Sequence, residues 1–122
     1  MLFRSDRAAL EARTPIQRIR SLGAAWMRLS EEDPKVTAAV LSQLPIPGSP
    51  RCLLRDELSR VLTEALSAAK RAGAVSASLD DVRLAGLVGA FEAVGLLSAT
   101  RPDFDFRHGS EVLSELTLRL YR

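Results

Sequence analysis

The last third of the sequence, residues 79–122, predicts two successive helices with more apolar surface than one short chain can cover. In LDDVRLAGLVGAFEAVGLL, helical spacing produces two adjoining stripes: Leu84, Val88, Phe91 and Gly95 form the first, and Ala85, Gly89 and Leu96 form the second. In FRHGSEVLSELTLRLYR, one stripe holds Leu113, Leu116 and Leu120, whereas Leu118 and Tyr121 point elsewhere. A helix that is apolar on two sides usually lies in the core of a larger assembly, and the simplest such assembly is a dimer.

We therefore expect a homodimer formed through the helices at 80–100 and 106–121. Gly86, Gly89 and Gly95 support a close approach to the first of these helices, because each interior glycine costs about 0.8–1 kcal/mol relative to alanine. The approaching group is either another helix or a ligand. The predicted dimer interface comprises Ala85, Gly89, Leu96, Leu113, Leu116, Leu118 and Tyr121.

The rest of the chain also predicts helix, and no alternating strand pattern persists beyond a few residues. A short helix is expected at 5–12. Cap-and-proline pairs at Thr14-Pro15, Asp33-Pro34 and Ser49-Pro50 then begin three more helices, the second of which extends through Leu44. Gly73 is the expected C-cap of the third, and Ser78 with Asp81 resembles a capping box for the next helix. These signals predict an all-α fold, a single helical-bundle domain of five or six helices.

Composition excludes several functional classes. The chain has a single histidine, His108, and a single cysteine, Cys52, so it lacks the spacings typical of metal sites or nucleophilic catalysis. We expect no enzymatic activity, no cofactor and no metal, and interpret His108 as a partly exposed residue at the start of a helix. No signal peptide is visible, and the longest near-apolar window, residues 84–99, is shorter than a bilayer span and contains Glu92. We therefore expect a cytoplasmic protein without a membrane partner.

The positive charge is concentrated near the N-terminus. Residues 1–30 carry six arginines against Asp6 and Glu11, a formal charge of +4, while the remaining residues carry −2. This distribution is compatible with a surface for a polyanion, but it favours the simpler interpretation of a solvated, arginine-rich helix face.

Two positions have more than one interpretation. Glu92 projects from an otherwise apolar helix, and the sequence favours an exposed or interface-rim position over a polar group that lines a cavity or pairs across a subunit boundary. A buried Glu92 would need a partner such as an arginine. Trp26 and Met27 favour core packing over a pocket wall, yet they share a helix with small residues that leave space beside them. The pocket predicted on this basis is lined by Trp26, Met27, Val40, Leu62, Leu66, Val88 and Phe91, with Glu92 as its polar contact.

The order of elements resembles the C-terminal effector-binding and dimerisation domain of TetR-family transcriptional regulators. Four stretches carry the resemblance: PIQRIRSLGAAWMRLSEEDPKV, RDELSRVLTEALSAAKRAGAVSASLD, DDVRLAGLVGAFEAVGLL and RPDFDFRHGSEVLSELTLRLYR. It lies in the pattern of helices and breaks, since this domain has no invariant catalytic motif. Residues 2–12, LFRSDRAALEA, resemble the connection that follows the family's DNA-binding head, with Phe3, Arg7 and Leu10 as matching positions.

The resemblance implies that the last two helices pair with those of a second subunit as a four-helix bundle. It also implies that the earlier helices wall a pocket for a small, mostly apolar or aromatic effector. Residues 1–13 would then be a connecting segment and residues 14–122 the ligand-binding and dimerisation domain. The family's N-terminal helix-turn-helix is not in this sequence, so DNA would be bound only through a domain that this chain does not contain.

The sequence thus predicts the sensing and dimerisation domain of a TetR-like repressor, with a second copy and a small-molecule effector as partners. The alternative is a stand-alone helical protein–protein interaction module without a ligand cavity. A third interpretation is direct nucleic-acid binding by the arginine-rich first helices. A cavity would distinguish the first from the second, and salt-dependent retention of DNA would identify the third.

Overall fold

The computed structural model describes residues 13–122, and this part of the chain forms five helices without strands. The expected short helix at 5–12 lies outside the described residues, and so do Phe3, Arg7 and Leu10, the positions that match the family's connecting segment. The predicted all-α fold, a single helical-bundle domain, is confirmed. The helices are α2 (Pro15–Glu32), α3 (Pro34–Leu41), α4 (Pro50–Arg71), α5 (Asp81–Thr100) and α6 (Phe106–Tyr121).

Local capping chemistry begins α2, α3 and α4 where the sequence predicts. Thr14 forms a capping box, in which its hydroxyl accepts from the Gln17 backbone N–H while the Gln17 side chain accepts from the Thr14 N–H. At α3 and α4 the cap is a single contact: Asp33 accepts from the backbone N–H of Val36 and Ser49 from that of Cys52, and a proline follows each cap. Because a proline at the first helical position has no N–H to leave unpaired, these three starts are determined by a few neighbouring residues.

Three predicted helix boundaries are wrong. The second helix ends at Leu41 rather than at Leu44, and Leu44 is exposed in the connection to α4. Asp80, not Ser78, is the N-cap of α5: its carboxylate accepts from the backbone N–H of Arg83, which holds the pKa of Asp80 below its ordinary value. Asp80 also pairs with the Arg83 side chain. At the end of α4, Ala72 is the C-cap, and Gly73, predicted as the cap, follows it with φ +74°.

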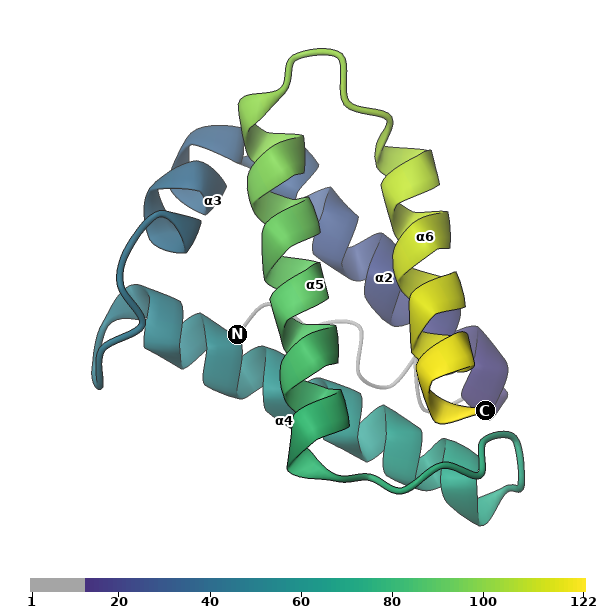
Figure 1. The fold of residues 1–122 in the computed structure, drawn as a ribbon. Coiled ribbons are helices and arrows are strands. Elements are labelled where there is room, and N and C mark those ends of the chain that lie inside the picture. The colour runs from purple at the N-terminus through teal and green to yellow at the C-terminus, as the bar shows by residue number, and fades with distance from the viewer. Residues whose placement is uncertain (1–12) are drawn as a thin grey trace.

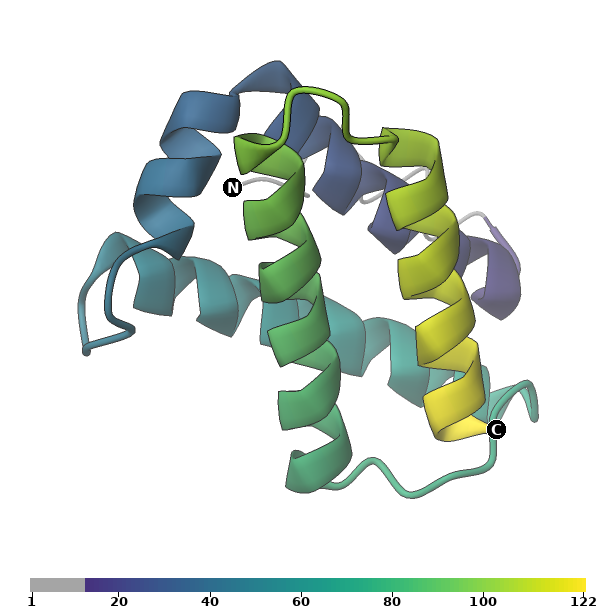
Figure 2. The same ribbon diagram turned by 45° about the horizontal axis from the view of Figure 1, so that its top comes forward.

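The helices are arranged in two crossing layers. Figures 1 and 2 show α5 and α6 side by side as an antiparallel pair, with α2 behind them and α4 crossing the lower end of α5. α3 lies beside α5 at its other end. Between the layers is a core whose largest buried side chains are Trp26 of α2, Phe91 of α5 and Tyr121 of α6.

The connection between α4 and α5 is fixed by the end of α6. The backbone N–H groups of Ser76 and Ala77 both donate to the carbonyl of Tyr121, at 3.0 Å each. The ring of Tyr121 is buried, and this burial, together with the charge of Asp80, raises the pKa of its phenol, while Arg83 partly opposes the rise.

Gly95 lies where α2 and α3 approach α5 most closely. A Cβ at this position would be 2.9 Å from the indole nitrogen of Trp26 and 3.0 Å from a methyl group of Leu41. The indole N–H in turn donates to the Phe91 carbonyl at 2.7 Å. The absence of a side chain at Gly95 therefore allows the largest residue of the core to contact the backbone of α5.

We expect Gly95→Ala to destabilise the fold. The clash lowers the unfolding free energy by about 1–3 kcal/mol, and the better helix propensity of alanine offsets about 1 kcal/mol of this loss. Gly86→Ala is the matched control on the same helix, since nothing lies within 4 Å of a Cβ there. Urea unfolding of the monomer, at a protein concentration too low for dimerisation, should show a lower unfolding free energy for Gly95→Ala and an unchanged or higher one for Gly86→Ala. A Gly95→Ala variant as stable as the wild type would contradict the close approach of Trp26.

Candidate functional site

Glu92 is a buried carboxylate on α5, with only 6% of its surface exposed. The favoured prediction of an exposed or interface-rim position is therefore wrong. The arginine partner expected for a buried Glu92 is present, and it belongs to the same protomer rather than to a second subunit. The reason is that α4 crosses α5 at this level and presents two arginines to it. An unpaired carboxylate at this depth would be strongly unfavourable.

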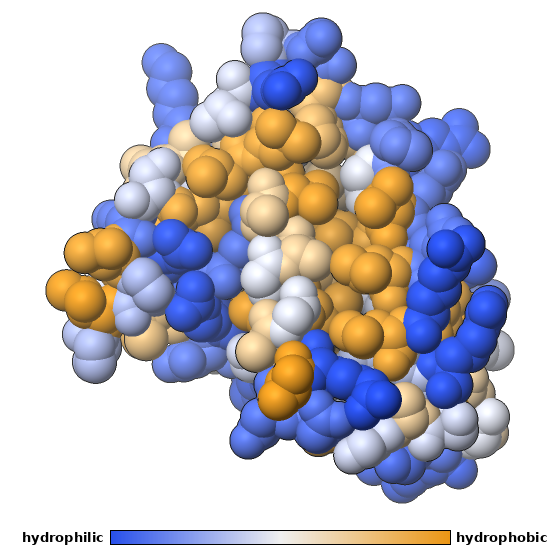
Figure 3. Space-filling view, in the orientation of Figure 1, coloured by the Kyte–Doolittle hydropathy of each residue, from blue (hydrophilic) through white to orange (hydrophobic). Residues whose placement is uncertain are grey.

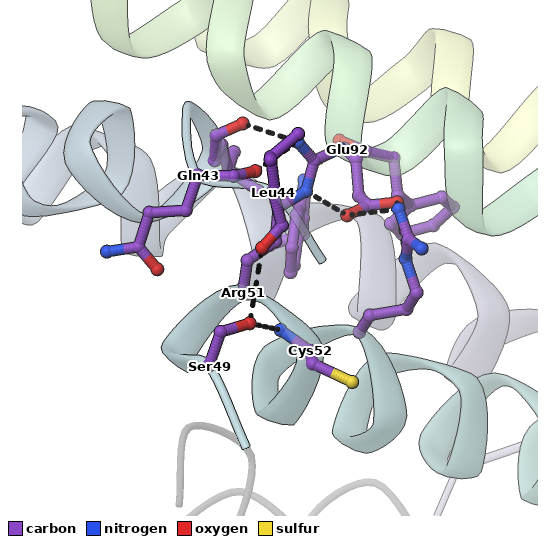
Figure 4. Close-up of polar contacts among 10 residues, drawn as sticks. Gln43, Leu44, Ser49, Arg51, Cys52 and Glu92 are labelled. Carbon is purple, nitrogen blue, oxygen red and sulfur yellow. Dashed lines mark hydrogen bonds and ion pairs between the residues drawn. The ribbon is translucent and has the colours of Figure 1, made fainter. Parts of the chain in front are cut away.

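Arg51 and Arg55, one turn apart on α4, bind Glu92 together. Figure 4 shows Arg51 beside Glu92. Arg55 forms a two-point contact, with Nε 3.1 Å from Oε1 and Nη2 3.3 Å from Oε2 of Glu92. Arg51 donates from Nε to Oε2 at 3.1 Å. Both arginine side chains remain partly accessible, at 22% for Arg51 and 36% for Arg55, whereas the carboxylate is enclosed.

Arg51 also binds the end of α3. Its Nη1 donates to the carbonyl of Leu41 at 2.9 Å and to that of Gln43 at 2.8 Å. Carbonyls at a helix C-terminus have no partner within the helix and carry partial negative charge, so a guanidinium group is a suitable partner for them. One arginine thus joins the C-terminus of α3 to α4 and α5. We name the three residues Arg51, Arg55 and Glu92 the charged cluster.

The first turn of α4 is positioned by its own cap. The Ser49 hydroxyl accepts from the backbone N–H of Cys52 at 3.1 Å and donates to the Leu44 carbonyl at 3.3 Å (Figure 4). The connection between α3 and α4 is therefore fixed at both ends, by Ser49 and by Arg51. The sequence analysis did not identify Arg51 and Arg55, although their spacing of four residues places both on one helix face.

Six of the eight residues predicted to line a pocket belong to the contiguous apolar core. Trp26 is 1% exposed and contacts Phe91 edge-on, with ring centroids 6.0 Å apart. Val40 is only half-buried on α3 and is not among the core residues, and Glu92 belongs to the charged cluster. The six residues that the fold brings together in the core are Trp26, Met27, Leu62, Leu66, Val88 and Phe91.

The second candidate site is the solvent-facing side of α5 and α6, where apolar side chains gather in a continuous area (Figure 3). The largest are Val82, 83% exposed, and Leu97, Val112 and Leu116, each about two-fifths exposed. Small residues lie between them on α5, and at Gly86 and Gly89 a Cβ would meet nothing within 4 Å. We name this surface the outer face; its exposed residues are Val82, Ala85, Gly86, Gly89, Ala93, Leu97, Val112 and Leu116.

The predicted dimer interface coincides with the outer face only in part. Ala85, Gly89 and Leu116 lie on it. Leu96 and Leu118 are half-buried and pack against the core of the protomer itself. Leu113 and Tyr121 are core residues, 0% and 1% exposed. The stripe of α6 that faces inward therefore holds Leu113 and Tyr121, and Val112 and Leu116 are the large apolar residues left outside.

α5 is apolar around most of its circumference. No membrane span is predicted from the sequence, because its longest near-apolar window covers only residues 84–99. In the structure, however, α5 is long and apolar enough by length and composition to cross a membrane. Only 33% of its apolar window is buried within the protomer. The helix therefore contributes one side to the core and leaves the opposite side, including Val82, Gly89 and Leu97, without cover from the described residues.

Elsewhere in residues 13–122, a second buried carboxylate, Glu57, pairs with Arg60 on the same helix. His108 is exposed in the first turn of α6, as the sequence predicts, and its backbone N–H donates to the capping carboxylate of Asp105. Within residues 13–122, no three histidine, cysteine, aspartate or glutamate side chains are placed to hold a metal ion. Comparisons of the chain with protein-family models, with curated proteins and with solved structures find no match.

Proposed function

We propose that the chain is the effector-sensing and dimerisation domain of a TetR-like transcriptional regulator, a repressor whose DNA contacts belong to a separate helix-turn-helix. The observation that carries this proposal is the outer face, a continuous apolar surface on an antiparallel helix pair. A soluble protein rarely exposes such a patch unless it binds something there.

A second copy of the chain is the occupant that fits the outer face best. Two antiparallel helices that each carry an apolar stripe can form a four-helix bundle with an identical pair across a twofold axis. Gly86 and Gly89 would let the partner's helices approach the backbone of α5 closely. The charged residues on α6 form pairs within the helix, Arg107 with Glu111 and Arg119 with Glu115, so contact at the outer face need not leave their charges unpaired.

The mass of the protein in solution tests this proposal. We expect sedimentation equilibrium at micromolar concentration to give twice the mass of the 13.3 kDa chain. A chain that is monomeric throughout the micromolar range would remove the main support for the proposed function.

An effector would act on the core around Trp26, Phe91 and Leu62. These side chains pack together, so a ligand that enters between them must separate α2 or α4 from α5. Binding would therefore be coupled to a movement of helices, which is what a sensing domain needs to change the spacing of attached DNA-binding heads.

Ligand binding can be followed through Trp26, the only tryptophan of the chain. We expect at least one member of a panel of apolar and aromatic compounds to change its fluorescence and to raise the melting temperature. At a ligand concentration 100 times the dissociation constant, the stabilisation is about 2.7 kcal/mol. A Trp26→Phe variant, which lacks the fluorescent ring, distinguishes quenching at this residue from absorption of light by the ligand.

The closed packing of the core favours a second candidate function, a stand-alone helical interaction module without a ligand cavity. Trp26, Leu62, Leu66 and Phe91 are each 1% exposed and belong to one continuous cluster. If the panel neither changes the fluorescence of Trp26 nor raises the melting temperature, while the chain still dimerises, this second function replaces the first.

A further inference from the structure

We propose that Glu92 is a positioning residue for the dimer: through the charged cluster it fixes the orientation of α5 and so presents the outer face to a second copy. This inference rests on the proposed dimerisation. It extends that proposal to a buried group on the flank of α5, beside the outer face, which does not itself touch the partner.

The charged cluster joins three helices at one carboxylate. Both oxygens of Glu92 accept from guanidinium groups of α4, and Arg51 simultaneously donates to the carbonyls of Leu41 and Gln43 at the end of α3. Charge-assisted hydrogen bonds with two-point geometry restrict angle as well as distance. The position of Glu92 is therefore determined by α3 and α4 together.

Other contacts of α5 constrain it from a different side. Trp26 donates to the Phe91 carbonyl, and Ser30 contacts the Gly95 carbonyl and the Ser98 hydroxyl, so these polar contacts come from α2. The hydrophobic effect, which drives the apolar contacts of α5, is itself non-directional. The charged cluster supplies the directional constraint from the α4 side.

The outer face begins within one turn of Glu92. Gly89 precedes it by three residues and Ala93 follows it directly, and both are exposed on the outer face. A helix moves as a rigid rod with a fixed rotation of about 100° per residue, so any rotation or shift of Glu92 moves Gly89 and Ala93 by the same amount. Close packing of small residues across a twofold axis tolerates little such movement.

The experiment measures the monomer–dimer dissociation constant of Glu92→Gln by sedimentation equilibrium, with helix content followed by circular dichroism. Glutamine keeps the size of the side chain but loses the charge, and the arginines it leaves can be solvated because both are partly exposed. We expect the folded variant to dimerise about tenfold more weakly than the wild type or worse, since each 1.4 kcal/mol of lost interaction is about tenfold.

The control is Leu66→Ala, which removes a buried side chain of α4 three turns beyond Arg55. It lowers the stability of the fold, and we expect its dimer affinity to stay within about threefold of the wild type, because distant sites act independently. Arg55→Lys is a second test variant: it keeps the charge but not the planar two-point geometry, and we expect a several-fold weaker dimer with helix content unchanged.

Three results would overturn the inference. A monomeric wild type would remove both the inference and the proposed function. A dimeric wild type with Glu92→Gln and Arg55→Lys of equal affinity would remove the inference alone. An equal loss of affinity in Leu66→Ala would show that any destabilisation of the fold weakens the dimer, so that Glu92 has no positioning role.

Discussion

Gly89→Leu should leave the protomer folded and separate it from its partner. Within the protomer nothing lies within 4 Å of a Cβ at this position, and leucine favours helix over glycine by about 0.8 kcal/mol, so the fold should gain stability. In the dimer the same side chain would enter a close helix–helix contact. Overpacking costs about 1–3 kcal/mol at each site, and a twofold axis repeats the cost.

The dissociation constant of the dimer should therefore rise by at least about 30-fold in Gly89→Leu, since each 1.4 kcal/mol corresponds to about tenfold. Sedimentation equilibrium measures the constant, and circular dichroism checks that the helix content is kept. Thr63→Leu adds the same side chain at an exposed position of α4, away from the outer face, and should leave the mass unchanged. A Gly89→Leu variant that remains fully dimeric would place the interface elsewhere.

The double substitution Arg51→Met and Arg55→Met should have the largest effect on stability of any change in the charged cluster. It leaves the carboxylate of Glu92 buried without a partner, and removing one side of a buried ion pair costs about 3–5 kcal/mol. We expect this loss in the unfolding free energy from urea titration, accompanied by release of the end of α3, because the carbonyls of Leu41 and Gln43 also lose their donor.

A third substitution distinguishes charge from packing. Adding Glu92→Leu to the arginine variant removes the unpaired charge, and apolar replacement of a whole buried ion cluster is often neutral or stabilising. We expect most of the lost stability to return in the triple variant. The surface double variant Arg107→Met and Arg119→Met, which removes two exposed pairs, should change stability by about 1 kcal/mol or less per pair. If the two double variants are equally stable, Glu92 is not enclosed as described.

Short-range chemistry made the helix starts predictable. Thr14, Asp33 and Ser49 each cap a helix that a proline begins, and these signals depend on residues within one turn. The start of α5 shows the limit of this reasoning, because Ser78 and Asp80 were both capable caps. Asp80 also pairs with the Arg83 side chain, an interaction that the cap pattern did not include.

The position of Glu92 could not be derived in the same way. Its partners lie 41 and 37 residues earlier in the chain, and only the crossing of α4 over α5 brings them within reach. The outer face was predictable in kind but not in detail. Periodicity placed Leu113 and Leu116 on one stripe of α6 and Tyr121 elsewhere, and this is wrong: Leu113 and Tyr121 are buried together, whereas Leu116 is exposed.

The contact between Tyr121 and the connection from α4 to α5 has a consequence for how the molecule is made. The carbonyl that receives the N–H groups of Ser76 and Ala77 belongs to the last residue of α6. During synthesis, Ser76 and Ala77 leave the ribosome well before Tyr121, so their hydrogen bonds to its carbonyl cannot form until Tyr121 has emerged. Domains form as units once their late segments are available. We therefore expect nascent chains arrested before residue 121 to be cleaved by protease within residues 72–80, and released full-length chains to resist cleavage there.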